Sequence, residues 1–95
     1  MNVEFLEPAY IEYQEAVDFY NLQSKGLGEK FILEIDRTIS IIKNYPESFT
    51  AYTQNTRKAG VSVFPYNIIY TIHKNYIEIL AIAHQHRKPE FWADR

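Results

Sequence analysis

Two neighbouring runs of residues constrain the fold of this chain more than any other feature. Phe64–Ile72 and Tyr76–His84 are rich in β-branched and aromatic residues, and only three residues, His73 to Asn75, separate them. A pair of such runs with a short polar link predicts a β-hairpin. We expect this hairpin to form the centre of a sheet on which the rest of the chain packs.

Side chains alternate between the two faces of a strand, so each run of the hairpin has two distinct faces. Alternate residues from Tyr66 to Ile72 form a wholly apolar and aromatic face. On the second run, alternate residues from Ile77 to Ala83 would share that face, which we expect helices to cover. The same alternation places His84 and His86 on the opposite face, at the end of the strand.

Two segments before the hairpin carry apolar residues at helical spacing. One stripe runs from Tyr10 to Tyr20 and the other from Leu27 to Ile42. The glycines of Gly26-Leu27-Gly28 allow a tight reversal between them, and Pro46 stops the second segment. This pattern predicts an αα-hairpin that must bury its stripes against the sheet.

The pattern as a whole predicts an α+β fold for residues 1–95, in one domain. We expect an N-terminal strand within residues 3–6, the αα-hairpin on one face of a mainly antiparallel sheet, and a short C-terminal helix or tail. A strand is also predicted over residues 57–64.

Composition and the N-terminal residues limit the cellular location. The chain has no cysteine, no apolar run near the ~20 residues of a membrane span, and no basic and apolar signal segment after Met1. These features predict a cytoplasmic protein that makes no contact with a membrane. They also predict that no disulfide bond contributes to the fold.

Charge is distributed unevenly along the chain. Residues 1–48 contain nine acidic and four basic residues, whereas residues 49–95 contain three acidic and six basic residues. An acidic partner would therefore prefer the second half, although chance clustering on solvated surfaces explains the asymmetry equally well. The basic or aromatic residues that we select there are Arg57, Lys58, His84, His86, Arg87 and Trp92.

Three pieces of sequence together resemble the RelE/ParE superfamily of bacterial type II toxins, on its ParE-like side. They are the Gly26-Leu27-Gly28 link, the strand start at Phe64-Pro65-Tyr66, and the tail from His84 to Trp92 with its Arg-x-Pro-x-x-Trp pattern. The resemblance covers almost the whole chain. It implies a plasmid-stabilisation toxin that a cognate antitoxin neutralises, and that acts on DNA gyrase (ParE-like) or on ribosome-bound mRNA (RelE-like).

Chemistry favours binding over catalysis within that superfamily. RNA cleavage needs an acid, a base and a cation at the phosphate. The resemblance implies an arginine early in the central strand and a tyrosine or histidine near the C-terminus of RelE-like nucleases, and these positions fall near Asn67 and Phe91 here. His84, His86, Arg57 and Arg87 remain as catalytic candidates if the chain is a metal-independent endoribonuclease.

The C-terminal residues have structural as well as functional interpretations. His84 and His86 could supply two metal ligands, but no third ligand stands at a suggestive spacing, so we predict no metal and no cofactor. Phe91 and Trp92 are either a hydrophobic lid on the end of the sheet or an exposed anchor for a partner.

We therefore expect a toxin that inhibits a target by protein–protein contact, with DNA gyrase as the resemblance-based target. Arg57, Lys58, His84, His86, Arg87 and Trp92 are the expected contacts with target or antitoxin. The alternatives are a ribosome-dependent mRNA endoribonuclease and a degenerate, non-toxic member that only binds its partner. The antitoxin is expected to carry an acidic or amphipathic C-terminal segment, and a homodimer is possible.

Overall fold

The computed structural model describes residues 1–95 and contains two helices and a five-stranded sheet. The elements in chain order are β1 (Asn2–Phe5), α1 (Glu7–Gln23), α2 (Leu27–Asn44), β2 (Thr50–Ala51), β3 (Arg57–Gly60), β4 (Tyr66–Ile72) and β5 (Tyr76–His84). Neither helix is both long and apolar enough to cross a membrane.

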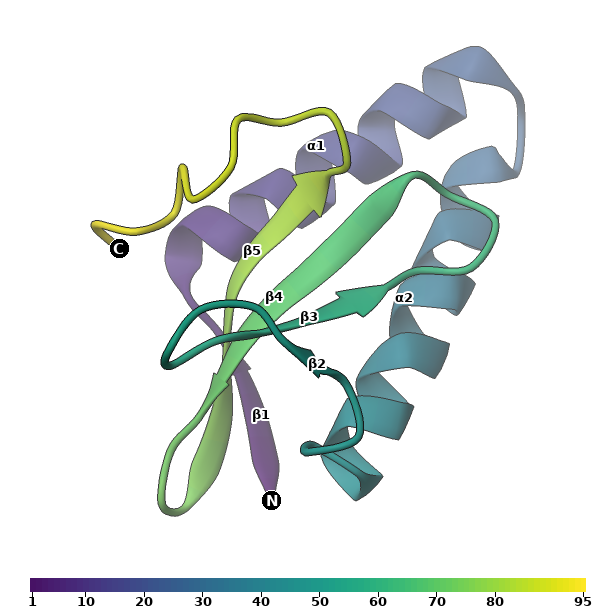
Figure 1. The fold of residues 1–95 in the computed structure, drawn as a ribbon. Coiled ribbons are helices and arrows are strands. Elements are labelled where there is room, and N and C mark those ends of the chain that lie inside the picture. Colours follow the sequence, from purple (N-terminus) through teal and green to yellow (C-terminus); the bar gives the residue numbers. More distant parts are fainter.

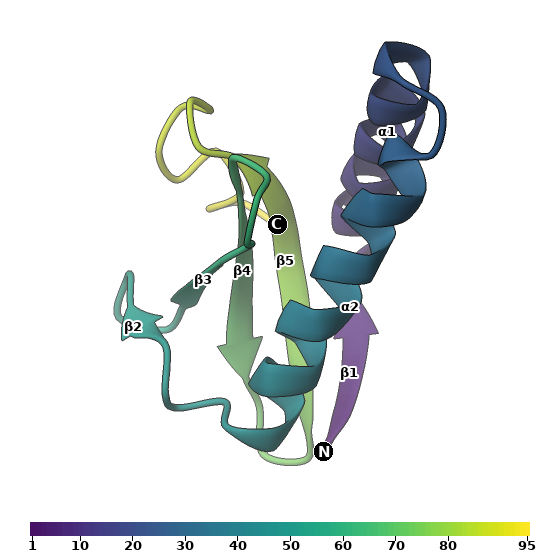
Figure 2. The same ribbon diagram turned by 90° about the vertical axis from the view of Figure 1, so that its right-hand side faces the viewer.

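The sheet has the strand order β1-β5-β4-β3-β2, with the β4–β5 hairpin at its centre (Figure 1). β1 runs parallel to β5, and the other neighbouring strands are antiparallel. Both helices lie on one side of the sheet (Figure 2). The predicted α+β fold is thus confirmed, and the C-terminal segment is a tail of turns.

The link between the helices shows why its glycines are needed. Gly26 has a φ of 83°, a left-handed conformation that glycine adopts without a steric penalty. The Gly28 N–H donates a hydrogen bond to Asn21 Oδ1 at 2.9 Å, and a β-carbon at this residue would overlap the Asn21 side chain. The two glycines therefore permit both the reversal and the close approach of α2 to the end of α1.

Aromatic rings fill the space between the hairpin of helices and the sheet. Phe31 of α2 is fully buried, and its ring centroid lies between 5.1 and 6.2 Å from four other rings. Those rings belong to Tyr13, Tyr20, Phe64 and Tyr66. This group joins both helices to β4 and to the loop before it.

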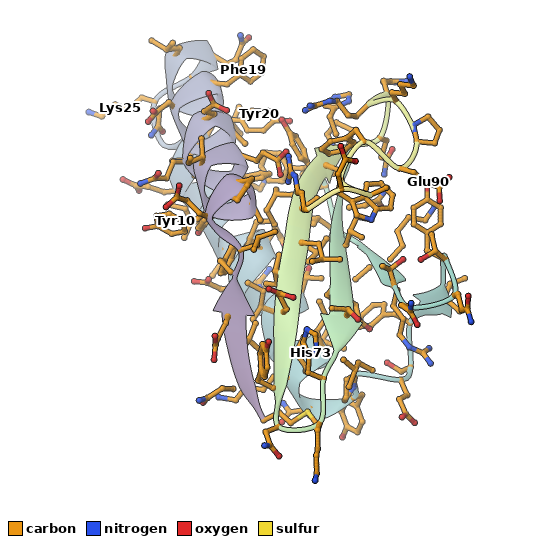
Figure 3. All side chains as sticks on the ribbon, turned by 90° about the vertical axis from the view of Figure 1, so that its left-hand side faces the viewer. Tyr10, Phe19, Tyr20, Lys25, His73 and Glu90 are labelled. Atoms are coloured by element: carbon orange, nitrogen blue, oxygen red, sulfur yellow. The ribbon has the colours of Figure 1, made fainter.

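The helical stripe predicted for α1 is only partly right. Ala9 and Ala16 are the fully buried residues of this helix, whereas Tyr10 is 48% exposed. Figure 3 shows Tyr20 pointing from α1 toward the sheet and Tyr10 on the outer side of the helix. Alanine is small enough to let α1 approach β5 closely, and a tyrosine at either position would prevent this approach. The two alanines are therefore the residues of α1 that become buried.

β3 is shorter than predicted, and an irregular loop replaces its second half. The strand ends at Gly60, and Val61 and Phe64 turn their side chains into the core. Between them Val63 is 71% exposed and has a φ of 74°, which is unusual for a β-branched residue.

A β-bulge changes the expected faces of β5. Ile69 pairs with Ala81 and Tyr70 pairs with Ile79, so Leu80 has no partner on β4. Before the bulge Ile77 and Ile79 face the helices; after it Ile82 does, while Ala81 and Ala83 face the other side. His84 is therefore on the helix face, not on the opposite face as strict alternation predicts.

Candidate interaction surface

The six candidate contact residues do not form one cluster. They lie in three different parts of the surface. Arg57 lies on the helix side of β3. Lys58 and Trp92 lie on the outer face of the sheet, the face that the helices leave free. His84, His86 and Arg87 lie where β5 ends and the tail begins.

Arg57 anchors the loop between α2 and β2. It pairs with Tyr70, whose side chain is in the main core, so both point to the helix side. The Arg57 guanidinium donates hydrogen bonds from Nη1 to the carbonyls of Phe49 at 2.7 Å and Glu47 at 3.1 Å. The Tyr70 hydroxyl donates to the Pro46 carbonyl at 2.6 Å. Arg57 is thus already engaged in holding backbone.

Trp92 belongs to a small apolar cluster on the outer face, and Lys58 lies at the border of that cluster. Trp92 is only 5% exposed and packs with Ile69, Ala81 and Ala83. Tyr52 lies against its ring at a centroid distance of 5.3 Å, and Lys58 Nζ stands 4.3 Å from the Tyr52 ring. The two alanines leave the room that the indole fills, so Trp92 covers the sheet as a lid.

The two histidines lie side by side at the end of β5. The His84 ring contacts Tyr66 edge-on at 5.2 Å and His86 at 5.3 Å. The His86 backbone N–H donates to His84 Nδ1 at 3.1 Å, so a neutral His84 carries its proton on Nε2. No group of three or more histidine, cysteine, aspartate or glutamate side chains is arranged to hold a metal ion.

Arg87 belongs to a network whose other members were not among the candidates. Its guanidinium lies over the Phe91 ring at 3.9 Å, and its Nη1 is 4.0 Å from Glu12 Oε2. Arg95 Nη2 is 2.7 Å from the same oxygen. Glu12 and Arg95 are far apart in the sequence, so no spacing or periodicity could have connected them.

Four tyrosines remain protonated well above neutral pH. Burial raises the pKa of Tyr20, Tyr66 and Tyr70 above the usual 10.0, with a smaller contribution from Tyr20 to the pKa of Tyr66. Burial, together with the negative charge of Asp36, also raises the pKa of Tyr13. Tyr66, beside His84, is therefore a neutral hydroxyl and no base at physiological pH.

A groove along α1 is a second candidate surface. This α1 groove has a volume of about 570 Å³ and is lined by Tyr10, Ile11, Tyr13, Gln14, Glu15, Val17, Asp18 and Ile32. Tyr10 and Ile11 are about half exposed. Two lining residues are acidic and none is basic, so the groove combines an apolar floor with negative charge.

The geometry separates Arg57 from the other three possible catalytic groups, which lie together where β5 ends. Tyr66 pairs with His84 and Tyr70 pairs with Arg57, so these two side chains are offset by four residues along β4, or roughly 14 Å. A general base and a cation that act on one phosphate must both lie within hydrogen-bonding distance of it. Arg57 and His84 do not meet that condition.

Substituting Arg57 and Lys58 separately will distinguish a structural residue from a surface residue. We expect Arg57→Ala to lower the free energy of unfolding by about 1–3 kcal/mol, because two carbonyls lose a charged donor. Lys58→Ala should cost less than about 1 kcal/mol, since it loses only a cation–π contact. Urea denaturation of both variants measures this, and equal losses would contradict the assigned roles.

Comparison with known proteins agrees with the fold and with the resemblance seen in the sequence. Residues 3–89 match the family described as the ParE toxin of the type II toxin-antitoxin system, parDE. A solved chain from the chromosomal ParDE toxin-antitoxin system of P. aeruginosa has the same fold, with a TM-score of 0.77 and 14% sequence identity. That match covers 88% of this chain and 95% of the solved one. No curated protein sequence matches. The chain therefore belongs to the ParE toxin family of type II toxin-antitoxin systems.

Proposed function

We propose that this protein is a cytoplasmic toxin that inhibits DNA gyrase by binding it and performs no covalent chemistry of its own. Membership of the ParE toxin family supports a toxin, and the resemblance of the sequence to ParE-like toxins suggests gyrase as the target. A cognate antitoxin keeps the toxin inactive until the antitoxin is lost.

This proposal rests on how the candidate cations are engaged: Arg57 lies apart from the histidines, and Arg87, which lies near them, is held by Phe91 and Glu12. Arg57 is engaged with two backbone carbonyls on the helix side, and His84 lies offset along the sheet. Burial raises the pKa of Tyr66, whose ring contacts His84, so its hydroxyl stays protonated at neutral pH. These arrangements support binding surfaces rather than a nuclease site.

The lining of the α1 groove suggests where the antitoxin binds and which kind of segment it uses. Its apolar floor and its acidic residues, Glu15 and Asp18, suit an amphipathic segment whose polar side is basic. We infer that the antitoxin places such a segment along α1, with apolar side chains against Tyr10 and Ile11. Of the two kinds of segment expected from the sequence, acidic or amphipathic, the groove favours the amphipathic one, with a basic polar side.

A supercoiling assay with purified gyrase tests the proposed target. We expect added protein to reduce the conversion of relaxed plasmid to supercoiled plasmid, and premixing with the cognate antitoxin to restore it. Gyrase that keeps its full activity at saturating toxin would exclude it as the target. Mapping transcript ends in cells that express the protein adds a second check, since position-specific mRNA cuts would show a nuclease instead.

A further inference from the structure

β5 is longer than β1, the strand that pairs with its outer edge, so part of that edge is free. β1 pairs with β5 only from Tyr76 to Ile79, and the Leu6 N–H donates the last hydrogen bond of this pairing to the Ile79 carbonyl at 2.9 Å. β5 continues to His84, while the chain leaves the sheet at Leu6 to begin α1. From Leu80 onward this edge of the central hairpin therefore has no strand beside it.

Two side chains take the place of the missing strand. Glu12 Oε1 accepts a hydrogen bond from the Ile82 backbone N–H at 3.1 Å, and Arg95 Nη1 donates to the Leu80 carbonyl at 2.9 Å. The two side chains also bind each other through both carboxylate oxygens, at 3.0 and 2.7 Å. Together they supply the acceptor and the donor that a neighbouring strand would supply.

The same pair fastens the C-terminal tail. Residues 85–95, here called the strap, leave the end of β5 and run back beside its free edge to Arg95, on the side of the sheet away from the helices (Figures 1 and 2). Within the strap the Phe91 ring contacts the guanidinium groups of Arg87 at 3.9 Å and Arg95 at 5.1 Å. Its neighbour Trp92 covers Ile69, Ala81 and Ala83.

The side chains of Glu12 and Arg95 are largely shielded from water. Water therefore screens the attraction between their charges less than in a fully exposed ion pair. The Glu12 side chain is 12% exposed and that of Arg95 is 18% exposed, and the guanidinium presents two parallel donors to the carboxylate. Bidentate pairs of this kind are among the stronger hydrogen-bonded contacts in proteins. By contrast, the strap has no regular secondary structure and makes few other hydrogen bonds to the sheet.

We propose that the Glu12–Arg95 pair is a latch that holds the strap closed, and that the strap opens as one unit when the latch is released. Opening uncovers two surfaces together, the β5 edge around Ile82 and the apolar outer face under Trp92. The closed strap thus keeps an unpaired strand edge from pairing with another chain, a contact that exposed edges readily make. This device does not depend on the identity of the target.

Two probes report the two surfaces independently. Trp92 is the only tryptophan, so intrinsic fluorescence and its quenching by acrylamide report the outer face alone. Hydrogen exchange at the Ile82 amide reports the β5 edge, because Glu12 is its acceptor. Exchange at the Ile35 amide, whose residue is fully buried in α2, reports whether the whole domain stays folded.

The decisive variants are Glu12→Ala and Arg95→Ala. We expect each to speed exchange at Ile82 by about tenfold or more and to shift Trp92 emission to the red, with Ile35 still protected. Arg95→Ala is the sharper test, because it leaves the Glu12 carboxylate free to accept from Ile82. The matched control is Glu7→Gln, an exposed change on the same helix and outside the α1 groove, which should alter neither probe.

Two outcomes would overturn the proposal. One is faster exchange at Ile82 with unchanged Trp92 emission, since the two surfaces would then open separately. The other is no change in either probe. If Glu12→Ala unfolds the whole domain, Arg95→Lys decides, because it keeps the charge but loses the parallel donors. Arg95→Lys must then both speed hydrogen exchange at Ile82 and shift Trp92 emission to the red, and the two changes must indicate the same open fraction of the strap.

Discussion

Replacing Phe31 by alanine will lower the free energy of unfolding by about 3–5 kcal/mol, which is a large part of the roughly 5–15 kcal/mol typical of a small domain. Phe31 is fully buried and contacts four aromatic rings from α1, β4 and the loop before β4. Rigid rings cannot close the space that it leaves, so a cavity remains. Thermal denaturation should show Tm falling by roughly 12–40 °C.

Phe19→Ala is the matched control for that variant. Phe19 is also in the helical hairpin, but its side chain is 52% exposed and contacts only the Tyr20 ring among the aromatic residues (Figure 3). Both substitutions gain the same helix propensity from alanine, so the difference between them isolates burial. We expect Phe19→Ala to cost less than about 1 kcal/mol. Similar losses for both variants would mean that the aromatic group does not hold the layers together.

Local patterns were enough to predict both helices and the two strands of the central hairpin, because each pattern depends on neighbours in the chain. The 3.6-residue period gave both helices, and Gly26 and Pro46 gave their limits. The two-residue period gave the faces of β4 correctly. It failed on β5 because the bulge at Leu80 depends on which β4 residues stand opposite, and this register is a tertiary property. The error moved His84 to the other face.

The sequence already implies that Arg57 and Lys58 lie on opposite faces of the sheet, since both belong to a predicted strand. Adjacent residues of a strand point to opposite faces, so these two could never act on the same surface from within a strand. Both were expected to contact the target or the antitoxin. The structure shows one side chain holding the loop after α2 and the other lying over Tyr52.

Contacts between segments that are far apart in the sequence could not be predicted from local patterns. Neither Glu12 nor Arg95 is among the residues that the sequence singles out. They meet because α1 crosses the unpaired end of β5 and the strap returns to the same point. The α1 groove is similar, since Ile32 of α2 joins residues of α1 only after the hairpin of helices has packed.

Reversing the charge of the α1 groove should strongly weaken binding of the antitoxin. Glu15 and Asp18 stand one helical turn apart beside the exposed Tyr10 and Ile11, and the lining contains no basic residue. A basic amphipathic segment would place its cations against these carboxylates. Reversing both charges turns attraction into repulsion, and like charges facing each other across an interface cost several kcal/mol.

We therefore expect the double variant Glu15→Lys and Asp18→Lys to bind the cognate antitoxin at least roughly a hundredfold more weakly in a calorimetric titration, which corresponds to about 2.7 kcal/mol. Because both residues are exposed, the loss should shrink as salt is raised. The control is Glu29→Lys with Glu47→Lys, which changes the net charge equally at exposed positions outside the groove. If both double variants weaken binding alike, the antitoxin responds to overall charge and the groove is not its site. If only the groove variant weakens binding, a compensating change of basic residues to acidic ones in the antitoxin segment should restore it.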